Sequence, residues 1–411
     1  MNKLNYLAGV MLVASLTTGV AEAEPLKIGV LESLSGGQTS TGRPFATAAG
    51  FGIDLINQAG GFNGAKIEFL EYDNGGNTTG AADKFKQAVA DGVHIVVQGA
   101  SSAIAGQISE DVRRHNLRNP DRPIMFINLG AEALELTGDK CHFHHFRFTT
   151  TAPMRVVPLV SAMKENGDLG GKVYSINQNY SWGRDMEAAI KAAADSGGYK
   201  VVGTTLHEVN KIQDFSPFVA TIRDSGADTV MTGNWSNDLL LLMKAAGDAG
   251  LKVRFGTTFL DQVGNIANAG TTALGHYVAH PYNIALDDTS FPEDFKRATG
   301  HYPVYIEPQS VNAMRALGEA LKKVNFNGGK VDVNKIAAAL EESSVKTPIG
   351  EITVRKEDHQ AMLPVVVSRV EKGAKYPVDG TDMGFKPVKT LTGAEAIYPV
   401  QSSCKMQRPR A

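Results

Sequence analysis

LKIGVLESLSGGQTSTG, residues 26–42, joins a short apolar run, a loop of small polar residues and the start of an amphipathic segment. The apolar run is short enough for a buried parallel strand. After the loop, apolar residues recur at the spacing of a helix with one buried face: Phe45, Ala49, Ile53 and Ile56. Because a strand followed by a loop and a helix is the repeating unit of parallel α/β sheets, we expect that fold class.

The same unit recurs along the chain. Amphipathic segments alternate with further apolar runs: KIEFLEYD from 66, VHIVVQG from 93, PIMFINLG from 123, KVYSINQ from 172, VVGTTL from 201, ADTVMTG from 227 and GHYVAHP from 275. This alternation predicts right-handed βαβ units in parallel sheets. One parallel sheet with so many strands is uncommon, and FRFTTTAP at 146–153 indicates a break. We therefore expect an α/β fold with two doubly wound parallel-sheet lobes.

Composition excludes several classes of protein. The 411 residues favour two domains. The chain has 41 Lys and Arg against 43 Asp and Glu, a net charge of −2, and no long basic run. A nucleic-acid partner is therefore not expected, because binding one needs a concentrated positive surface. Gly is frequent, at 43 residues, but Pro numbers only 17 and no low-complexity tract occurs, which excludes collagen-like and disordered classes.

The first 23 residues have the pattern of a secretory signal peptide. Lys3 supplies the positive charge, residues 6–16 form an apolar run, and Ala21-Glu22-Ala23 is an A-x-A cleavage site. The apolar run is too short to span a bilayer. No Cys stands at the cleavage site to accept a lipid. We expect a free periplasmic protein, cleaved after Ala23.

Cys141 and Cys404 are the two cysteines of the chain. In an oxidising compartment two such thiols are more often paired than free, so we expect a disulfide. The competing interpretation is a metal site in CHFHH at 141–145. Strand alternation would direct His142 and His144 to one face and His145 to the other. We therefore expect no metal at these residues.

Ligands of open α/β sheets bind beyond the carboxyl ends of the strands, so the loops there are the candidate site. LSGGQ at 34–38 is also a signature of ABC-transporter ATPases, but the chain has no phosphate-binding G-x-x-x-x-G-K-[ST] loop. The segment 99–103, GASSA, opens a helix whose backbone N–H groups favour an anion. The alternative is that Ser101 or Ser102 simply caps that helix.

Two tryptophans and one acid stand out in later loops. Trp182 follows the KVYSINQ run, and Trp235 follows the ADTVMTG run. A lone Trp is usually a core residue, but two at the ligand-facing ends of strands favour the aromatic walls of one cleft. Asp261 follows the next strand and is either a surface acid or the partner of a ligand cation.

These residues carry a family resemblance. Seven motifs occur in order: IGVLESLSGGQTSTG from 28, INQAGGFNG from 56, EYD from 71, QGASSA from 98, NLGAEALELTG from 128, NYSWGRD from 179 and TGNWSND from 232. The chain resembles the type I periplasmic solute-binding proteins of ABC importers, in particular the branched-chain amino-acid binding (leucine/isoleucine/valine-binding protein-like) family. The resemblance spans residues 26 to about 370.

The resemblance implies a ligand site. Family members bind the ligand carboxylate with loops that align with two segments of this chain: Ala100, Ser101, Ser102 and Ala103, and Gly130, Ala131 and Glu132. They pack the ligand side chain on residues that align with three further positions: Thr41, Tyr180 to Trp182, and Asn234 with Trp235. The ammonium partner of the family aligns with Asp261. Thr41 replaces an aromatic residue and Glu132 replaces a Thr, so we expect a pocket that differs from that of a Leu/Ile/Val binder.

The resemblance also implies two lobes joined by three crossovers. The first lobe comprises residues 24–149 and 281–362, and the second comprises 150–280 and 363–411. We expect the disulfide to tie the C-terminal tail to the second lobe. The ligand binds between the lobes and stabilises a closed form that the importer's membrane subunits recognise.

We therefore expect a monomeric binding protein without cofactor or catalytic residues. Its ligand is a small carboxylate: a branched-chain or aromatic amino acid first, and an aromatic acid second. One alternative is a ligand sensor of the same fold that serves a receptor. An exported enzyme is a weaker alternative, because neither G-x-S-x-G nor a spaced His/Asp set occurs.

Overall fold

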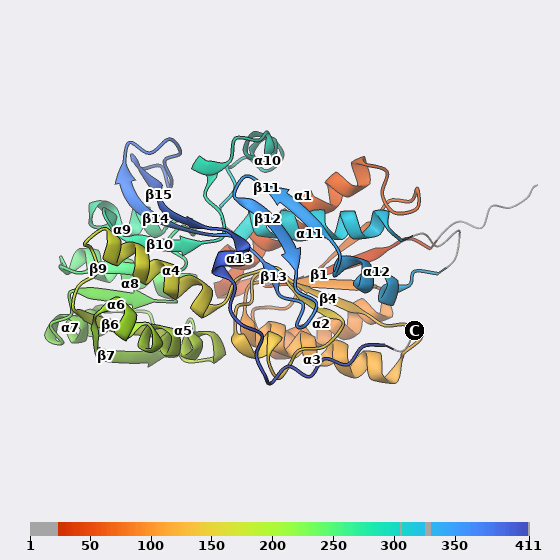
Figure 1. Ribbon diagram of the computed structural model, residues 1–411, viewed down its shortest axis with the longest axis horizontal. Helices are drawn as coiled ribbons and strands as arrows, with labels where there is room; N and C mark the ends of the chain where they lie inside the picture. Colours follow the sequence, from red (N-terminus) through yellow and green to blue (C-terminus); the bar gives the residue numbers. More distant parts are fainter. Residues whose placement is uncertain (1–23, 305, 325–329, 410–411) are drawn as a thin grey trace, which may run out of the picture.

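The computed structural model of the protein describes residues 24–304, 306–324 and 330–409. The expected signal peptide, residues 1–23, lies outside them. Two lobes lie side by side along the long axis of the molecule (Figure 1). No helix in these ranges is long and apolar enough to cross a membrane.

The first lobe is built on a five-stranded sheet of order β2-β1-β3-β4-β5, in which every pairing is parallel. Its strands are β1 (Lys27–Glu32), β2 (Glu68–Asp73), β3 (Ile95–Gln98), β4 (Met125–Asn128) and β5 (His145–Arg147). The helices α1 (Thr39–Gln58), α2 (Thr78–Ala90) and α3 (Ser102–Arg118) connect the first four strands. All residues of β3 and β4 are buried, as expected for strands covered on both faces.

Three helices from much later in the chain complete this lobe: α10 (Phe291–Thr299), α11 (Ile306–Lys322) and α12 (Val333–Leu340). α11 packs along α1 at very short range. A Cβ at Gly52 of α1 would lie 2.5 Å from Cβ of Met314, so only glycine permits this approach. The first half of the chain therefore depends on residues about 260 positions away for its packing.

The second lobe is built on a seven-stranded sheet of order β15-β14-β10-β9-β8-β6-β7. Its strands are β6 (Lys172–Gln178), β7 (Lys200–His207), β8 (Thr229–Thr232), β9 (Arg254–Thr257), β10 (Tyr277–His280), β14 (Val365–Lys372) and β15 (Met383–Leu391). Its helices are α4 (Ala152–Glu165), α5 (Ser181–Ala192), α6 (Ala194–Gly197), α7 (Ser216–Asp224), α8 (Asn237–Asp248) and α9 (Asn265–Ala269). The strands expected from the sequence pair in parallel, and the sheet ends at one edge in β14 and β15, an antiparallel hairpin that needs no crossover helix and that the sequence analysis did not anticipate.

The chain passes between the two sheets three times: after β5, after β10 and after β13 (Ala361–Met362). A small antiparallel sheet of β11 (Ser344–Thr347), β12 (Gly350–Val354) and β13 precedes the third passage. The two-lobe fold with three crossovers is thus confirmed. The exact lobe boundaries given above stay a prediction.

The C-terminal tail is anchored differently from the expectation. After α13 (Gly393–Ala396) the chain returns to the first lobe, where Cys404 forms the expected disulfide with Cys141 (Figure 1). Gln401 Nε2 donates a hydrogen bond of 2.6 Å to the Leu134 carbonyl. The pairing is confirmed, but the expected anchoring of the tail to the second lobe is wrong, because Cys141 directly precedes β5 of the first sheet.

The histidines near Cys141 each have a different environment. His142 Nε2 lies 3.0 Å from Oγ of Ser109, and His144 Nε2 lies 2.7 Å from Oδ1 of Asn334. The ring of His145 stacks on Phe126. The alternation predicted for residues 142–145 does not occur, because β5 begins only at His145.

Candidate ligand-binding cleft

A hollow with about 300 Å³ of empty space lies at the carboxyl ends of strands from both sheets. Its lining residues come from α1 and from the loops after β3, β4, β6, β8 and β9. They are Thr41, Phe45, Gly99, Ala100, Ser102, Gly130, Glu132, Tyr180, Trp182, Trp235, Phe259 and Gln262. The structure therefore brings together residues from five of the seven sequence motifs.

The loop after β3 is held by a buried carboxylate. Glu32, at the end of β1, accepts hydrogen bonds from the backbone N–H of Gly99 at 2.5 Å and of Ala100 at 3.2 Å. Burial raises the pKa of Glu32 to about 8, although these backbone N–H groups favour its charged form. The N–H group of Ala100, a residue expected to bind the ligand carboxylate, is thus already occupied.

The groups of this segment that can still bind an anion are those of the next residues, at the start of α3. The first N–H groups of a helix have no acceptor within the helix and carry its positive dipole end. Ser102 lines the cleft there, and its Oγ accepts from the N–H of Ala133 at 3.2 Å, which leaves the hydroxyl proton for another acceptor. Ser101 makes no capping bond, and Ala103 is exposed; neither lines the cleft.

The loop after β4 is organised by Asn128. Its Oδ1 accepts from the N–H of Ala131 at 2.7 Å and from that of Gly130 at 3.2 Å. Its Nδ2 donates to the Ala131 carbonyl at 2.8 Å. These backbone groups therefore fix the loop, and the group that the loop presents to the cleft is the Glu132 side chain.

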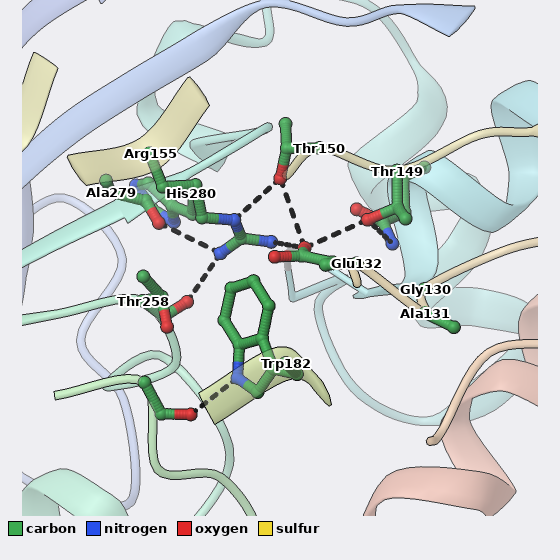
Figure 2. A network of polar contacts seen from close by, with 12 residues as sticks. Gly130, Ala131, Glu132, Thr149, Thr150, Arg155, Trp182, Thr258, Ala279 and His280 are labelled. Carbon is green, nitrogen blue, oxygen red and sulfur yellow. Dashed lines mark hydrogen bonds and ion pairs between the residues drawn. The ribbon is translucent and has the colours of Figure 1, made fainter. Parts of the chain in front are cut away.

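Glu132 is only 2% exposed, yet one of its two carboxylate oxygens has no partner. Oε1 accepts from Thr149 Oγ1 at 2.9 Å and from Thr150 Oγ1 at 3.1 Å, and it pairs with Arg155 (Figure 2). Oε2 has no hydrogen-bond partner within the described part of the chain. A buried, cleft-lining acceptor of this kind is well placed to receive a donor from a ligand.

Arg155 links this acid to the second lobe. It extends from α4 and is fully buried. Its guanidinium donates to Thr150 Oγ1 at 2.6 Å, to the Thr258 carbonyl at 2.5 Å and to the Ala279 carbonyl at 3.0 Å (Figure 2). The pair of Arg155 and Glu132 therefore lies at the base of the cleft, where the lobes meet.

The second lobe supplies the aromatic wall. Trp182 is buried and donates from Nε1 to the Gly233 carbonyl at 2.8 Å. Trp235 donates from Nε1 to the Tyr180 hydroxyl at 2.7 Å. Phe259, which the sequence analysis did not select, meets Trp182 edge-to-face with ring centroids 5.6 Å apart. Both tryptophans are thus core residues and cleft-lining residues at once.

Asp261 and Asn234 are not brought to the cleft. Asp261 Oδ2 lies 2.8 Å from Nδ1 of His280, and the residue borders a separate cavity of about 460 Å³ that Tyr282 and Phe385 also line. Asn234 is buried against His207. From the loop of Asp261 it is the neighbouring Gln262 that lines the cleft.

Gln262 and Phe45 are cleft residues that sequence reasoning missed. Phe45 was assigned to the buried face of a helix, and it serves that core as well as the cleft. Gln262 Oε1 accepts from the N–H of Ser236 at 2.9 Å, while Nε2 has no partner in the described ranges. The only sequence signal for Gln262 was its position beside Asp261.

Polar contacts bridge the lobes at two further places. Ser236 Oγ lies 3.3 Å from the Gly37 carbonyl and 3.4 Å from Ser40 Oγ. The N–H of Leu134 donates to Asp185 Oδ2 at 2.7 Å. The structure is therefore a closed form, in which Gly37 of the LSGGQ loop contacts the second lobe.

Comparison with known proteins gives consistent matches. The family model described as periplasmic binding protein matches residues 25–375. A Leu/Ile/Val-binding protein homolog 4 of Brucella abortus is 56% identical over 99% of both chains.

Solved structures give the same picture. The closed conformation of a leucine-, isoleucine-, valine-, threonine- and alanine-binding protein from Brucella ovis has a TM-score of 0.88 and 57% identity, and it covers 94% of this chain and 100% of its own. A solute-binding protein of an ABC transporter from R. palustris, in complex with 4-hydroxybenzoate, has a TM-score of 0.77 at 20% identity, covering 90% of this chain and 97% of its own. At that identity the second match shows the fold alone.

Proposed function

The chain belongs to the periplasmic binding protein family, and from that premise we propose that it captures a small amino acid or related carboxylate for an ABC importer. The observation that carries this proposal is the cleft itself, with a polar wall on one lobe and an aromatic wall on the other. The names of the relatives, which are Leu/Ile/Val-binding proteins or homologues of them, favour branched-chain amino acids as ligands. Aromatic amino acids and aromatic acids follow as second candidates.

Binding works by population shift. A ligand that touches only one lobe has equal affinity for the open and closed forms, so it does not shift the equilibrium between them. A ligand that reaches Ser102 on one lobe and Trp235 on the other gains its contacts only when the cleft closes. Closure also forms the contacts of Ser236 with Gly37 and of Leu134 with Asp185. The importer's membrane subunits then read the closed shape, and no bond of the ligand is made or broken.

A thermal-shift screen tests the ligand class. The protein is unfolded, dialysed and refolded to remove endogenous ligand, and then heated with leucine, isoleucine, valine, phenylalanine, benzoate or 4-hydroxybenzoate. A ligand at 100 times its dissociation constant adds about 2.7 kcal/mol to stability, which is a clear rise in melting temperature. Glucose and spermidine serve as controls. A response to a control compound alone contradicts the proposal.

Two further measurements separate the alternative functions. Mass spectrometry of the ligand after incubation with fresh protein must return it unchanged, because turnover indicates an enzyme. Capture from membrane extracts with ligand-loaded protein must recover transporter subunits, whereas recovery of a receptor indicates a sensor. Sequencing the N-terminus of the exported protein tests cleavage after Ala23.

A further inference from the structure

We propose that Glu132 Oε2 receives the ammonium group of the ligand, so that the cleft selects α-amino acids over acids that lack an amine. The inference rests on the proposed function, since it concerns the same cleft. It moves the amine-recognising acid from the loop after β9, where the family resemblance placed it at Asp261, to the loop after β4.

The first support is the unpartnered oxygen. Glu132 is buried and lines the cleft, and its Oε2 has no partner within the described residues, while Oε1 is shared by three donors. A buried carboxylate oxygen without a donor is costly, so the site gains most from a ligand that brings a donor. An ammonium group brings up to three N–H donors and a compensating charge.

The second support is the position of the anion site beside it. Ser102 Oγ accepts from the N–H of Ala133, the residue that follows Glu132. The hydroxyl and helix end that suit a carboxylate therefore adjoin the oxygen that suits an ammonium group. In an α-amino acid these two groups are attached to the same carbon, so one ligand can offer both to neighbouring residues of the cleft. A ligand carboxylate placed against Glu132 instead would face a like charge.

The third support is the arrangement of Asp261. Its Oδ2 contacts Nδ1 of His280, and His280 Nε2 lies 2.8 Å from Ser368 Oγ, so this acid belongs to a buried network of the second lobe. Its Oδ1 also lacks a hydrogen-bond partner within the described residues, so it is the position of Asp261 that separates it from Glu132. Asp261 borders the separate cavity near Tyr282 and is absent from the cleft lining.

The test compares matched ligands by titration calorimetry on the wild-type protein. Leucine is paired with 4-methylpentanoate, and phenylalanine with 3-phenylpropanoate; within each pair the acids differ only by the amine. We expect loss of the amine to weaken binding by about 10- to 100-fold. Equal affinity within both pairs overturns the inference and leaves the proposed function intact, whereas binding of none of the four overturns the proposed function.

Two variants locate the effect. In Glu132→Gln the preference for the amine is expected to fall by about tenfold or more, because the negative partner is gone and Arg155 keeps its charge. Asp261→Asn is the matched control, and its preference is expected to stay within twofold. The readout is the ratio of two affinities for one folded variant. Loss of the preference in Asp261→Asn, with retention in Glu132→Gln, overturns the assignment. If Glu132→Gln does not fold, the ligand pairs on the wild-type protein still show whether the amine is recognised. Asp261→Asn then tests which acid recognises it, since loss of the amine preference in that variant contradicts the assignment to Glu132.

Discussion

The two walls of the cleft are built on opposite plans. On the first lobe, buried side chains such as Glu32 and Asn128 bind the backbone N–H groups of the loops, so that few polar groups are left for a ligand. On the second lobe, the indole of Trp182 donates one hydrogen bond to Gly233, and that of Trp235 donates one to Tyr180. The rest of each ring is a flat apolar surface. The polar wall is thus specified by charge and the aromatic wall by shape.

This difference indicates how recognition is divided. A polar wall with one open acceptor at Glu132 discriminates strongly between head groups, because a missing donor leaves a buried charge unsatisfied. An aromatic wall discriminates weakly between side chains, because rings accept many apolar shapes. We therefore expect the protein to accept few kinds of ligand head group but many kinds of ligand side chain.

Removing Arg155 should break the polar wall most severely. Arg155→Ala leaves the buried Glu132 without its cation and is expected to lower the free energy of unfolding by about 3–5 kcal/mol. The double variant Glu132→Gln with Arg155→Met removes both charges and should recover much of that loss. Urea denaturation measures both. If Arg155→Ala lowers the free energy of unfolding no more than the double variant does, the ion pair of Arg155 and Glu132 is not what stabilises this wall.

Removing the disulfide should destabilise the polar wall, because it releases the C-terminal tail that contacts the loop of this wall. The tail that Cys404 anchors also holds the Leu134 carbonyl through Gln401, two residues beyond Glu132. Cys141→Ser with Cys404→Ser is expected to cost about 2–4 kcal/mol of unfolding free energy. A thiol count on the denatured, unreduced wild-type protein is the control. Two reactive thiols there would mean that the bond is not formed.

Removing a ring from the aromatic wall should lower ligand affinity but leave the preference between head groups unchanged. Trp235→Ala is expected to weaken binding of every ligand by about tenfold, since ring contacts contribute about 0.5–1.5 kcal/mol each beyond buried area. Tyr180→Phe removes only the hydroxyl that Trp235 contacts and should cost less. Titration with leucine and phenylalanine checks both. A change of head-group preference in Trp235→Ala would contradict the division between the walls.

Protonation of Glu32 should make the stability of the polar wall depend on pH. Burial raises the pKa of Glu32 from its ordinary value of about 4.5 to about 8, so between these values the folded state binds a proton that the unfolded state lacks. The contribution of Glu32 to stability therefore falls as pH rises from 5 to 8. His142, whose pKa burial lowers to about 3, acts in the opposite direction below its ordinary value.

The comparison of wild type with Glu32→Gln isolates the Glu32 effect from that of His142. The difference in unfolding free energy should change with pH between 5 and 8 in the direction given, as measured by denaturation at each pH. A pH-independent difference would contradict a raised pKa. Trp235→Ala provides the control, because the aromatic wall contributes no such titration.

The sequence predicted the loops of the cleft but not the direction of each side chain. Strand ends follow from apolar runs, so Ser102, Trp182 and Trp235 were expected near the cleft that they line, and Glu132 was expected there from the family resemblance. Asp261 was expected at the ligand because its loop is correctly placed, yet the side chain pairs with His280, a residue on another strand. Side-chain direction within a loop depends on such contacts between distant residues, which no local pattern encodes.

The tail shows the same limit at larger scale. Few long apolar runs follow residue 373, so no periodicity indicates which lobe the tail contacts. Its position depends on Cys141 and Leu134, far away in the chain. The antiparallel hairpin of β14 and β15 was missed for a related reason, since a buried strand has the same composition in either direction.

The disulfide has a mechanical consequence. Cys141 and Cys404 are 263 positions apart, and the whole seven-stranded sheet lies between them. Tension applied at residue 24 and at the C-terminal tail therefore travels through residues 24–141, crosses the sulfur bridge and leaves through the residues that follow Cys404. The second lobe carries no load. Reduction of the bridge under tension would release about 900 Å of additional chain, at about 3.3–3.6 Å for each of the 263 intervening positions.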